Sequence, residues 1–146
     1  MHPSVRAGWI AFTKPLEGGV DHGYLDIKGL VTIAYGSLVD PAQHALSLPL
    51  LRKDGSPASQ REIAAEWISL KARSCWATAG ARPADMADNV CPWKGTGQIC
   101  LAHLGAGTAK QFCNLHLDEE GMAKVALGKF DDFAGELARR FPDIDD

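Results

Sequence analysis

The sequence predicts an α+β fold, in which a small N-terminal antiparallel sheet is followed by a mostly helical remainder. Three observations support this prediction. Apolar residues recur at helical spacing before residue 17, and a β-branched run surrounds a glycine between residues 22 and 36. Helical spacing then returns after Ser59 and again after Asp118. We therefore expect one sheet at one end of a helical domain.

Length and composition are those of one globular domain. The 146 residues are enough to bury a core without disulfides or metal, and 46% apolar and 23% charged residues are ordinary proportions. The formal net charge is −3, and the 15 basic residues are scattered. This charge pattern argues against nucleic acid or an anionic membrane as the main partner. With no repeat and no linker, we expect one monomeric domain over residues 1–146.

Apolar runs along the chain are short. None reaches the roughly 18 residues that a membrane helix requires. The start, "MHPSVRAGWIAFTKP", holds only a brief apolar run from Trp9 to Phe12, which is shorter than a signal-peptide core. We expect synthesis in the cytoplasm without a signal peptide and no membrane insertion.

The first predicted element is a helix over residues 4–16. Val5, Trp9 and Leu16 are spaced to share one face of it. Pro15 falls near its end, so the last turn should be distorted.

The second predicted element is a β-hairpin within residues 22–36. If residues 27–29 form a three-residue loop, with its glycine in the left-handed conformation, Asp26 lies opposite Leu30. Thr32 then shares the face of Asp26, one diagonal step away, because side chains alternate along a strand. The alternative is that Asp26 only caps the turn and Thr32 is an ordinary strand residue.

The middle of the chain mixes one clear helix with irregular sequence. Residues 41–46 are compatible with a short helix. Ser59 and Glu62 form an S-x-x-E capping box in front of an apolar helical pattern, which predicts a helix there. Residues 74–117 are rich in glycine and cysteine and show no single period.

Two helices are predicted at the end of the chain. Asp118 resembles an N-cap and opens a helix to about Gly128. A second, amphipathic helix begins near Phe130 and runs to Phe141, where Pro142 ends it.

Glu17 lies at the expected end of the first predicted helix. A carboxylate there faces the negative end of the helix dipole, which costs from a few tenths to about 1 kcal/mol. That field, with Leu16 and Trp9 nearby, would favour the protonated form that a general acid needs. Gly18 and Gly19 would let the chain leave the helix sharply. The alternative is a solvated surface acid in a fraying turn.

The spacing E-x8-D-x5-T, within "EGGVDHGYLDIKGLVTIAYG", resembles the lysozymes of tailed phages, the endolysin or muramidase family. That family's pattern reads E-G, then Y-x-D, a glycine and T-I-G-x-G. The matching positions are Glu17, Gly18, Tyr24, Asp26, Gly29, Thr32, Ile33 and Gly36. The resemblance covers about residues 9 to 40.

The chain also departs from that family. Ala34 replaces its first glycine, and Ser37 replaces the histidine that usually follows the last one. The long apolar helix that fills the family's C-terminal lobe has no counterpart that we can find. We expect a single lysozyme-like domain whose C-terminal lobe is divergent or incomplete.

The resemblance implies an inverting muramidase without cofactor. It would cut peptidoglycan between N-acetylmuramic acid and N-acetylglucosamine, acting in the periplasm after release or injection. Glu17 would protonate the leaving oxygen, Asp26 would stabilise charge at the sugar or position a water, and Thr32 would help hold that water. Tyr24 and Tyr35 are candidates for substrate binding. The pattern does not distinguish hydrolysis from intramolecular transglycosylation, the reaction of a lytic transglycosylase.

Two other functions fit the sequence. One is a weakly active or inactive lysozyme-fold module that binds or builds a phage or secretion particle. The other is a small interaction domain supported by zinc, because two C-x2-H pairs with nine residues between them can supply tetrahedral ligands. The ligands would be Cys100, His103, Cys113 and His116. The simpler interpretation of the cysteines is buried thiols, although their even number would permit disulfides in an oxidising compartment.

Overall fold

The computed structural model describes residues 3–76 and 91–142, and only the backbone of His103. Its strands form one antiparallel sheet in the order β1-β2-β3. The elements are α1 (Pro3–Glu17), β1 (Val20–Leu25), β2 (Val31–Ala34), β3 (Ser37–Leu38), η1 (Ala42–His44), α2 (Gln60–Lys71), η3 (Leu101–His103), α4 (Gly105–Ala109), η4 (Lys110–Phe112) and α5 (Glu119–Arg140). The predicted α+β class with a small N-terminal sheet is therefore confirmed.

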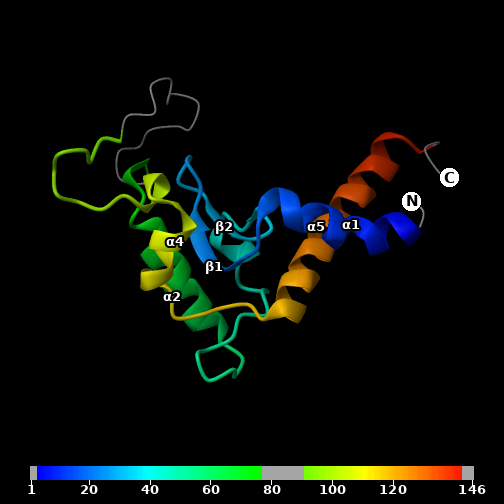
Figure 1. The fold of residues 1–146 in the computed structure, drawn as a ribbon, viewed down its shortest axis with the longest axis horizontal. Coiled ribbons are helices and arrows are strands. Elements are labelled where there is room, and N and C mark those ends of the chain that lie inside the picture. The colour runs from blue at the N-terminus through cyan, green and yellow to red at the C-terminus, as the bar shows by residue number, and fades with distance from the viewer. Residues whose placement is uncertain (1–2, 77–90, 143–146) are drawn as a thin grey trace.

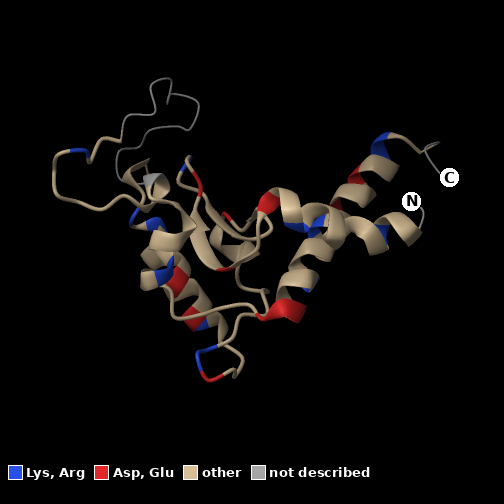
Figure 2. Cartoon of the chain, viewed as in Figure 1, with Lys and Arg blue, Asp and Glu red and all other residues tan. Residues whose placement is uncertain are grey.

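The sheet lies between two groups of helices (Figure 1). Helices α2 and α4 contact the sheet on one side, and α1 crosses α5 on the other. The crossing is held by Trp9 and Phe130, whose ring centroids are 5.2 Å apart, and by a 2.8 Å ion pair between Arg6 and Asp131. Basic and acidic residues are interspersed over the described helices and loops (Figure 2). None of the described helices is both long and apolar enough to cross a bilayer.

The hairpin between β1 and β2 has the predicted register. Tyr24 lies opposite Thr32, and the backbone N–H of Asp26 donates to the carbonyl of Leu30 at 3.0 Å. Gly29 takes the left-handed conformation, with φ +74°. The three-residue loop is therefore confirmed. A bulge in β1 before Tyr24 and the third strand, β3, were not predicted.

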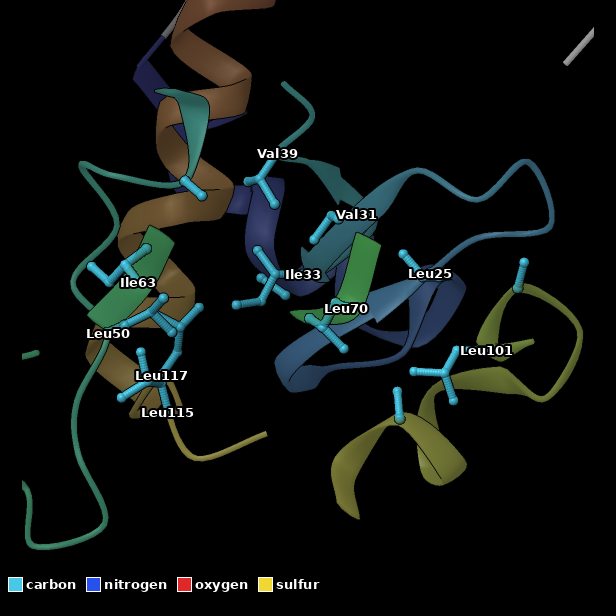
Figure 3. Close-up of a cluster of buried hydrophobic side chains, with 14 of the residues drawn as sticks. Leu25, Val31, Ile33, Val39, Leu50, Ile63, Leu70, Leu101, Leu115 and Leu117 are labelled. Atoms are coloured by element: carbon cyan, nitrogen blue, oxygen red, sulfur yellow. The ribbon is translucent and has the colours of Figure 1, made fainter. Parts of the chain in front are cut away.

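One face of the sheet packs against the hydrophobic core (Figure 3). Leu25, Val31 and Ile33 belong to the same buried cluster as Ile63 and Leu70 of α2. Further core residues come from the segments around α4 and before α5, namely Leu101, Leu115 and Leu117.

The neighbouring strand positions point to the opposite face, because side chains alternate along a strand. Across the three strands these positions form the row Tyr24–Thr32–Leu38. Leu38 is 51% exposed. Tyr24 and Thr32 therefore lie on the sheet face that does not pack on α2.

Helix ends follow the predicted caps. The Ser59 side chain accepts from the Glu62 amide, and the Glu62 carboxylate accepts from the Ser59 amide, which completes the capping box of α2. Asp118 accepts from the Gly121 amide at 2.7 Å and caps α5. At the end of α1, Gly18 adopts φ +62°, and its N–H donates to the carbonyl of Lys14.

The predicted break at Gly128 is wrong, because α5 continues through it to Arg140. Glycine inside a helix costs about 1 kcal/mol relative to alanine. Ala126 and Phe130 are both buried on the same helix, one on each side of Gly128. Packing against α1 and the sheet outweighs the local cost. The short helix predicted over residues 41–46 is a single 3-10 turn, η1.

The irregular region between residues 74 and 117 is only partly described. Its described part holds the short helices η3, α4 and η4, while residues 77–90 lie outside the described residues. No long apolar helix of the kind found in the lysozyme C-terminal lobe occurs in residues 91–117, within the described chain.

We expect Gly29→Ala to be strongly destabilising. A Cβ atom at Gly29 would lie 2.1 Å from the hydroxyl oxygen of buried Ser74, and the backbone is left-handed. Conformational strain and overpacking together should cost about 2–4 kcal/mol in the free energy of unfolding. Urea unfolding measures this loss. Gly55→Ala is the matched control, because Gly55 has φ +84° and nothing within 4 Å of a new Cβ. Equal losses in the two variants would contradict the packing at Gly29.

Candidate active site

Glu17 is exposed at the end of α1 and lies against the turn between β2 and β3. Its Oε2 atom is 2.7 Å from the position that a Cβ atom would take at Gly36. Gly36 has φ +71°, so both its conformation and its missing side chain suit this contact. The glycine-rich end of the motif therefore makes room for the Glu17 carboxylate.

A cavity of about 150 Å³ opens beside Glu17, between α1 and α5. Its walls are mostly apolar and include Trp9, Leu16 and Tyr35. Lys129 of α5 also lines it and donates from Nζ to the carbonyl of Gly36 at 3.0 Å. No pattern in the sequence points to Lys129, because only the packing of α5 brings it to this turn.

Asp26 caps the hairpin. Its Oδ1 atom accepts from the backbone N–H of Lys28 at 2.8 Å and of Leu30 at 2.9 Å. The turn-capping alternative for this residue is therefore observed. Oδ2 makes no hydrogen bond with any residue in the described part of the chain. One carboxylate oxygen is fixed by the turn, and the other is available to a ligand.

Tyr24 lies within electrostatic reach of both acids. Burial raises the pKa of Tyr24, and the negative charges of Glu17 and Asp26 raise it further. Thr32 lies directly across the sheet from Tyr24 and is buried. Its hydroxyl donates to the carbonyl of Leu30 at 3.2 Å, so its lone pairs can still accept a hydrogen bond. Tyr24 and Thr32 are thus neighbours in the sheet, and the charges of Glu17 and Asp26 both act on Tyr24.

Tyr35 is placed differently from Tyr24. It is only 5% exposed, and it lines the cavity beside Glu17. A Cβ atom at Gly19 would lie 3.2 Å from the Tyr35 ring and 3.0 Å from Met122. The Tyr35 ring is therefore a wall of this cavity.

A tyrosine titration can test this geometry without substrate. Because both acids raise the pKa of Tyr24, Glu17→Gln and Asp26→Asn should each lower it toward the ordinary tyrosine value. Tyrosinate absorbance measures the titration, Tyr24→Phe identifies the signal, and circular dichroism confirms that the fold survives at each pH. A Tyr24 titration that is unchanged in both variants would contradict the proximity of the three residues.

A second group of polar residues lies between α2 and the segment that precedes α5. Glu66 accepts from the backbone N–H groups of Asn114 and Leu115 at 2.7 and 3.1 Å, and burial raises its pKa. It lines a cavity of about 300 Å³. Burial and the charge of Glu66 raise the pKa of Cys113 to about 12. These contacts hold the segment before α5 against α2, and sequence reasoning had not singled them out.

The predicted zinc ligands are not brought together. The Cys100 sulfur lies with those of Cys75 and Cys91, whereas the Cys113 thiol donates to the carbonyls of Gly23 and Ala109. The reason is that α4 and η4 separate the two C-x2-H pairs and direct Cys113 toward β1. His116 belongs to no such group within the described chain, and the His103 side chain lies outside the description.

None of the four cysteines forms a disulfide. Cys75 and Cys100 are buried, while Cys91 and Cys113 are half-buried. Burial, followed by the neighbouring thiols of Cys100 and Cys91, raises the pKa of the Cys75 thiol.

Comparison with known proteins adds no family to this geometry. No protein-family model, curated protein or solved structure matches the chain.

Proposed function

We propose that the chain is a lysozyme-like glycoside hydrolase that cleaves the glycan strands of peptidoglycan between N-acetylmuramic acid and N-acetylglucosamine. The observation that carries this proposal is the placement of the two acids at the two turns that flank β2. Glu17 lies against Gly36 in the β2–β3 turn and Asp26 caps the β1–β2 turn, with the Tyr24–Thr32 pair between these turns along the sheet. Two carboxyl groups on either side of one site are what glycosidic hydrolysis uses. The resemblance to phage lysozymes assigns the same two residues.

Each residue has a defined role in the proposed reaction. Glu17 is exposed and gives its proton to the leaving glycosidic oxygen. The Oδ2 atom of Asp26 faces the developing positive charge at the sugar or takes a proton from the attacking water. The hydroxyl of Thr32 accepts a hydrogen bond from that water. No metal or organic cofactor enters this scheme.

A groove next to Glu17 suits a polymeric substrate. It has a volume of about 480 Å³ and is lined by β3, the segment around η1, and α5. Ser37 and Lys129 line both this groove and the cavity beside Glu17, so the two hollows are adjacent. A glycan strand is long and polar, and an open groove that leads away from the acid can accept it on one side of the scissile bond.

The second candidate function is a binding or structural module of a phage or secretion particle. The observation that favours it is the apolar surface of α1 and α5, where large side chains remain exposed. These residues are Val5, Phe12, Leu16, Phe133 and Phe141, each between 49% and 68% exposed. Exposed apolar side chains that gather on two neighbouring helices are typical of a surface that another protein covers.

Purified murein tests the proposal directly. The protein should release soluble muropeptides from murein and clear chloroform-permeabilised Gram-negative cells. Mass spectrometry of the products distinguishes the reactions, since hydrolysis leaves a reducing N-acetylmuramic end and transglycosylation leaves an anhydro end. If the folded protein releases no product but sediments with murein or particle proteins, the binding module is the better assignment.

A further inference from the structure

Three cysteines that are distant in sequence meet behind the hairpin. The sulfur atoms of Cys75, Cys91 and Cys100 all lie within 4.8 Å of one another. Cys75 follows the end of α2, Cys91 opens the next described segment, and Cys100 precedes η3. Cys75 and Cys100 are buried, and Cys91 is half-buried. None of these sulfurs has a place in the proposed reaction.

The spacing of the sulfurs suits a metal ion. Tetrahedral Zn²⁺ with Zn–S bonds of about 2.3 Å holds its sulfur ligands about 3.8 Å apart. Three sulfurs within 4.8 Å of one another therefore need only small movements to close on one ion. A disulfide would need a bond of about 2.05 Å and would leave one of the three cysteines out.

A backbone hydrogen bond supports the same conclusion. The N–H of Cys75 donates to the sulfur of Cys100 at 3.2 Å. Amide donors that point at a sulfur stabilise its thiolate form and orient it, which is the usual role of the groups around metal-bound cysteines. This donor is in place without any rearrangement of the chain.

We infer that Cys75, Cys91 and Cys100 bind one Zn²⁺ through three thiolates. Three S–H bonds break, three Zn–S bonds form, and three protons leave to solvent, so no oxidant or reductant is required. A water or another donor completes the tetrahedron. This site differs from the ligand set that the C-x2-H pairs predicted and shares with it only Cys100.

The site has a structural role close to Asp26. Residues 91–100 form turns without a regular element, and Cys91 and Cys100 bracket them. The neighbours of Cys75 touch the hairpin loop, since a Cβ atom at Gly29 would lie 2.1 Å from Ser74 and 3.1 Å from Trp76. A metal at the three cysteines therefore fixes both the irregular segment and the packing behind the loop that Asp26 caps.

Metal titration tests the inference on the full chain. Protein stripped by chelator under reducing conditions should bind one equivalent of Co²⁺ with the charge-transfer absorption of thiolate ligands, and Zn²⁺ should displace it. Affinity should increase with pH, because the ligands lose protons on binding. A free Zn²⁺ concentration of about 100 times the Kd should raise the melting temperature of the protein by roughly 10 °C.

Two cysteine variants make the test specific. Cys91→Ser replaces the most accessible of the three ligands. Removal of a group that only supports a metal ligand lowers metal affinity by roughly 10- to 100-fold, so removal of the ligand itself should lower it further. Cys113→Ser is the matched control, because Cys113 lies outside the cluster and should leave binding unchanged. Absence of Co²⁺–thiolate absorption in the reduced wild type, or equal binding by Cys91→Ser, would overturn the inference.

Discussion

Glu17→Gln is expected to abolish murein cleavage and leave the fold intact. The amide keeps the shape of the side chain but has no proton for the leaving oxygen. Loss of a general acid lowers rates by about 10²- to 10⁴-fold. Glu17 is exposed, so the free energy of unfolding should change by less than about 0.5 kcal/mol. Muropeptide release and urea unfolding measure the two effects on the same preparation.

The control for this variant is Glu120→Gln. Glu120 is also exposed and also lies at a helix end, in the first turn of α5, but it has no place in the proposed site. It should keep the activity of the wild type. If Glu17→Gln releases muropeptides within a few-fold of the wild type, Glu17 is not the proton donor, and a different acid must be sought.

The hairpin that carries Asp26 could be predicted from sequence because its geometry is local. A three-residue loop with Gly29 in the left-handed conformation fixes which residues face each other. The caps of α2 and α5 are local for the same reason, since Ser59 and Asp118 bond to amides only three residues away.

Other features depend on contacts between distant segments. The predicted end of α5 at Gly128 is wrong because a glycine favours a break locally, whereas burial of Phe130 on the same helix favours continuation. The cysteine cluster joins Cys75 to Cys100 across 25 residues, and spacing along the chain favoured a different pairing. Lys129 reaches Gly36 only because α5 lies beside the sheet.

Asp26 illustrates why a sequence pattern alone leaves a role open. Its Oδ1 atom has a structural role, because it accepts two backbone N–H groups of the turn. That role by itself would account for an aspartate at this position. The proposed chemistry needs the negative charge in addition, and only a change that separates charge from turn capping can distinguish the two.

Asp26→Asn makes that separation. The asparagine carbonyl can still accept from the amides of Lys28 and Leu30, so the hairpin should persist, with a loss of less than about 1 kcal/mol in the free energy of unfolding. Murein cleavage should nevertheless fall by at least about 100-fold, because the charge that faces the sugar is gone. Asp26→Ala should show the same loss of activity and a further destabilisation of about 1–3 kcal/mol, because both turn amides lose their acceptor.

The comparison of the two variants decides the role of Asp26. An inactive but stable Asp26→Asn protein would mean that the carboxylate charge takes part in cleavage. A nearly active Asp26→Asn protein beside an unstable Asp26→Ala protein would mean that Asp26 acts only through the turn. Cleavage would then rest on Glu17 alone, as in a lytic transglycosylase, and the products should carry anhydro ends. Measuring muropeptide release, product ends and urea unfolding on both variants separates these cases, because charge affects the first two and turn capping affects the third.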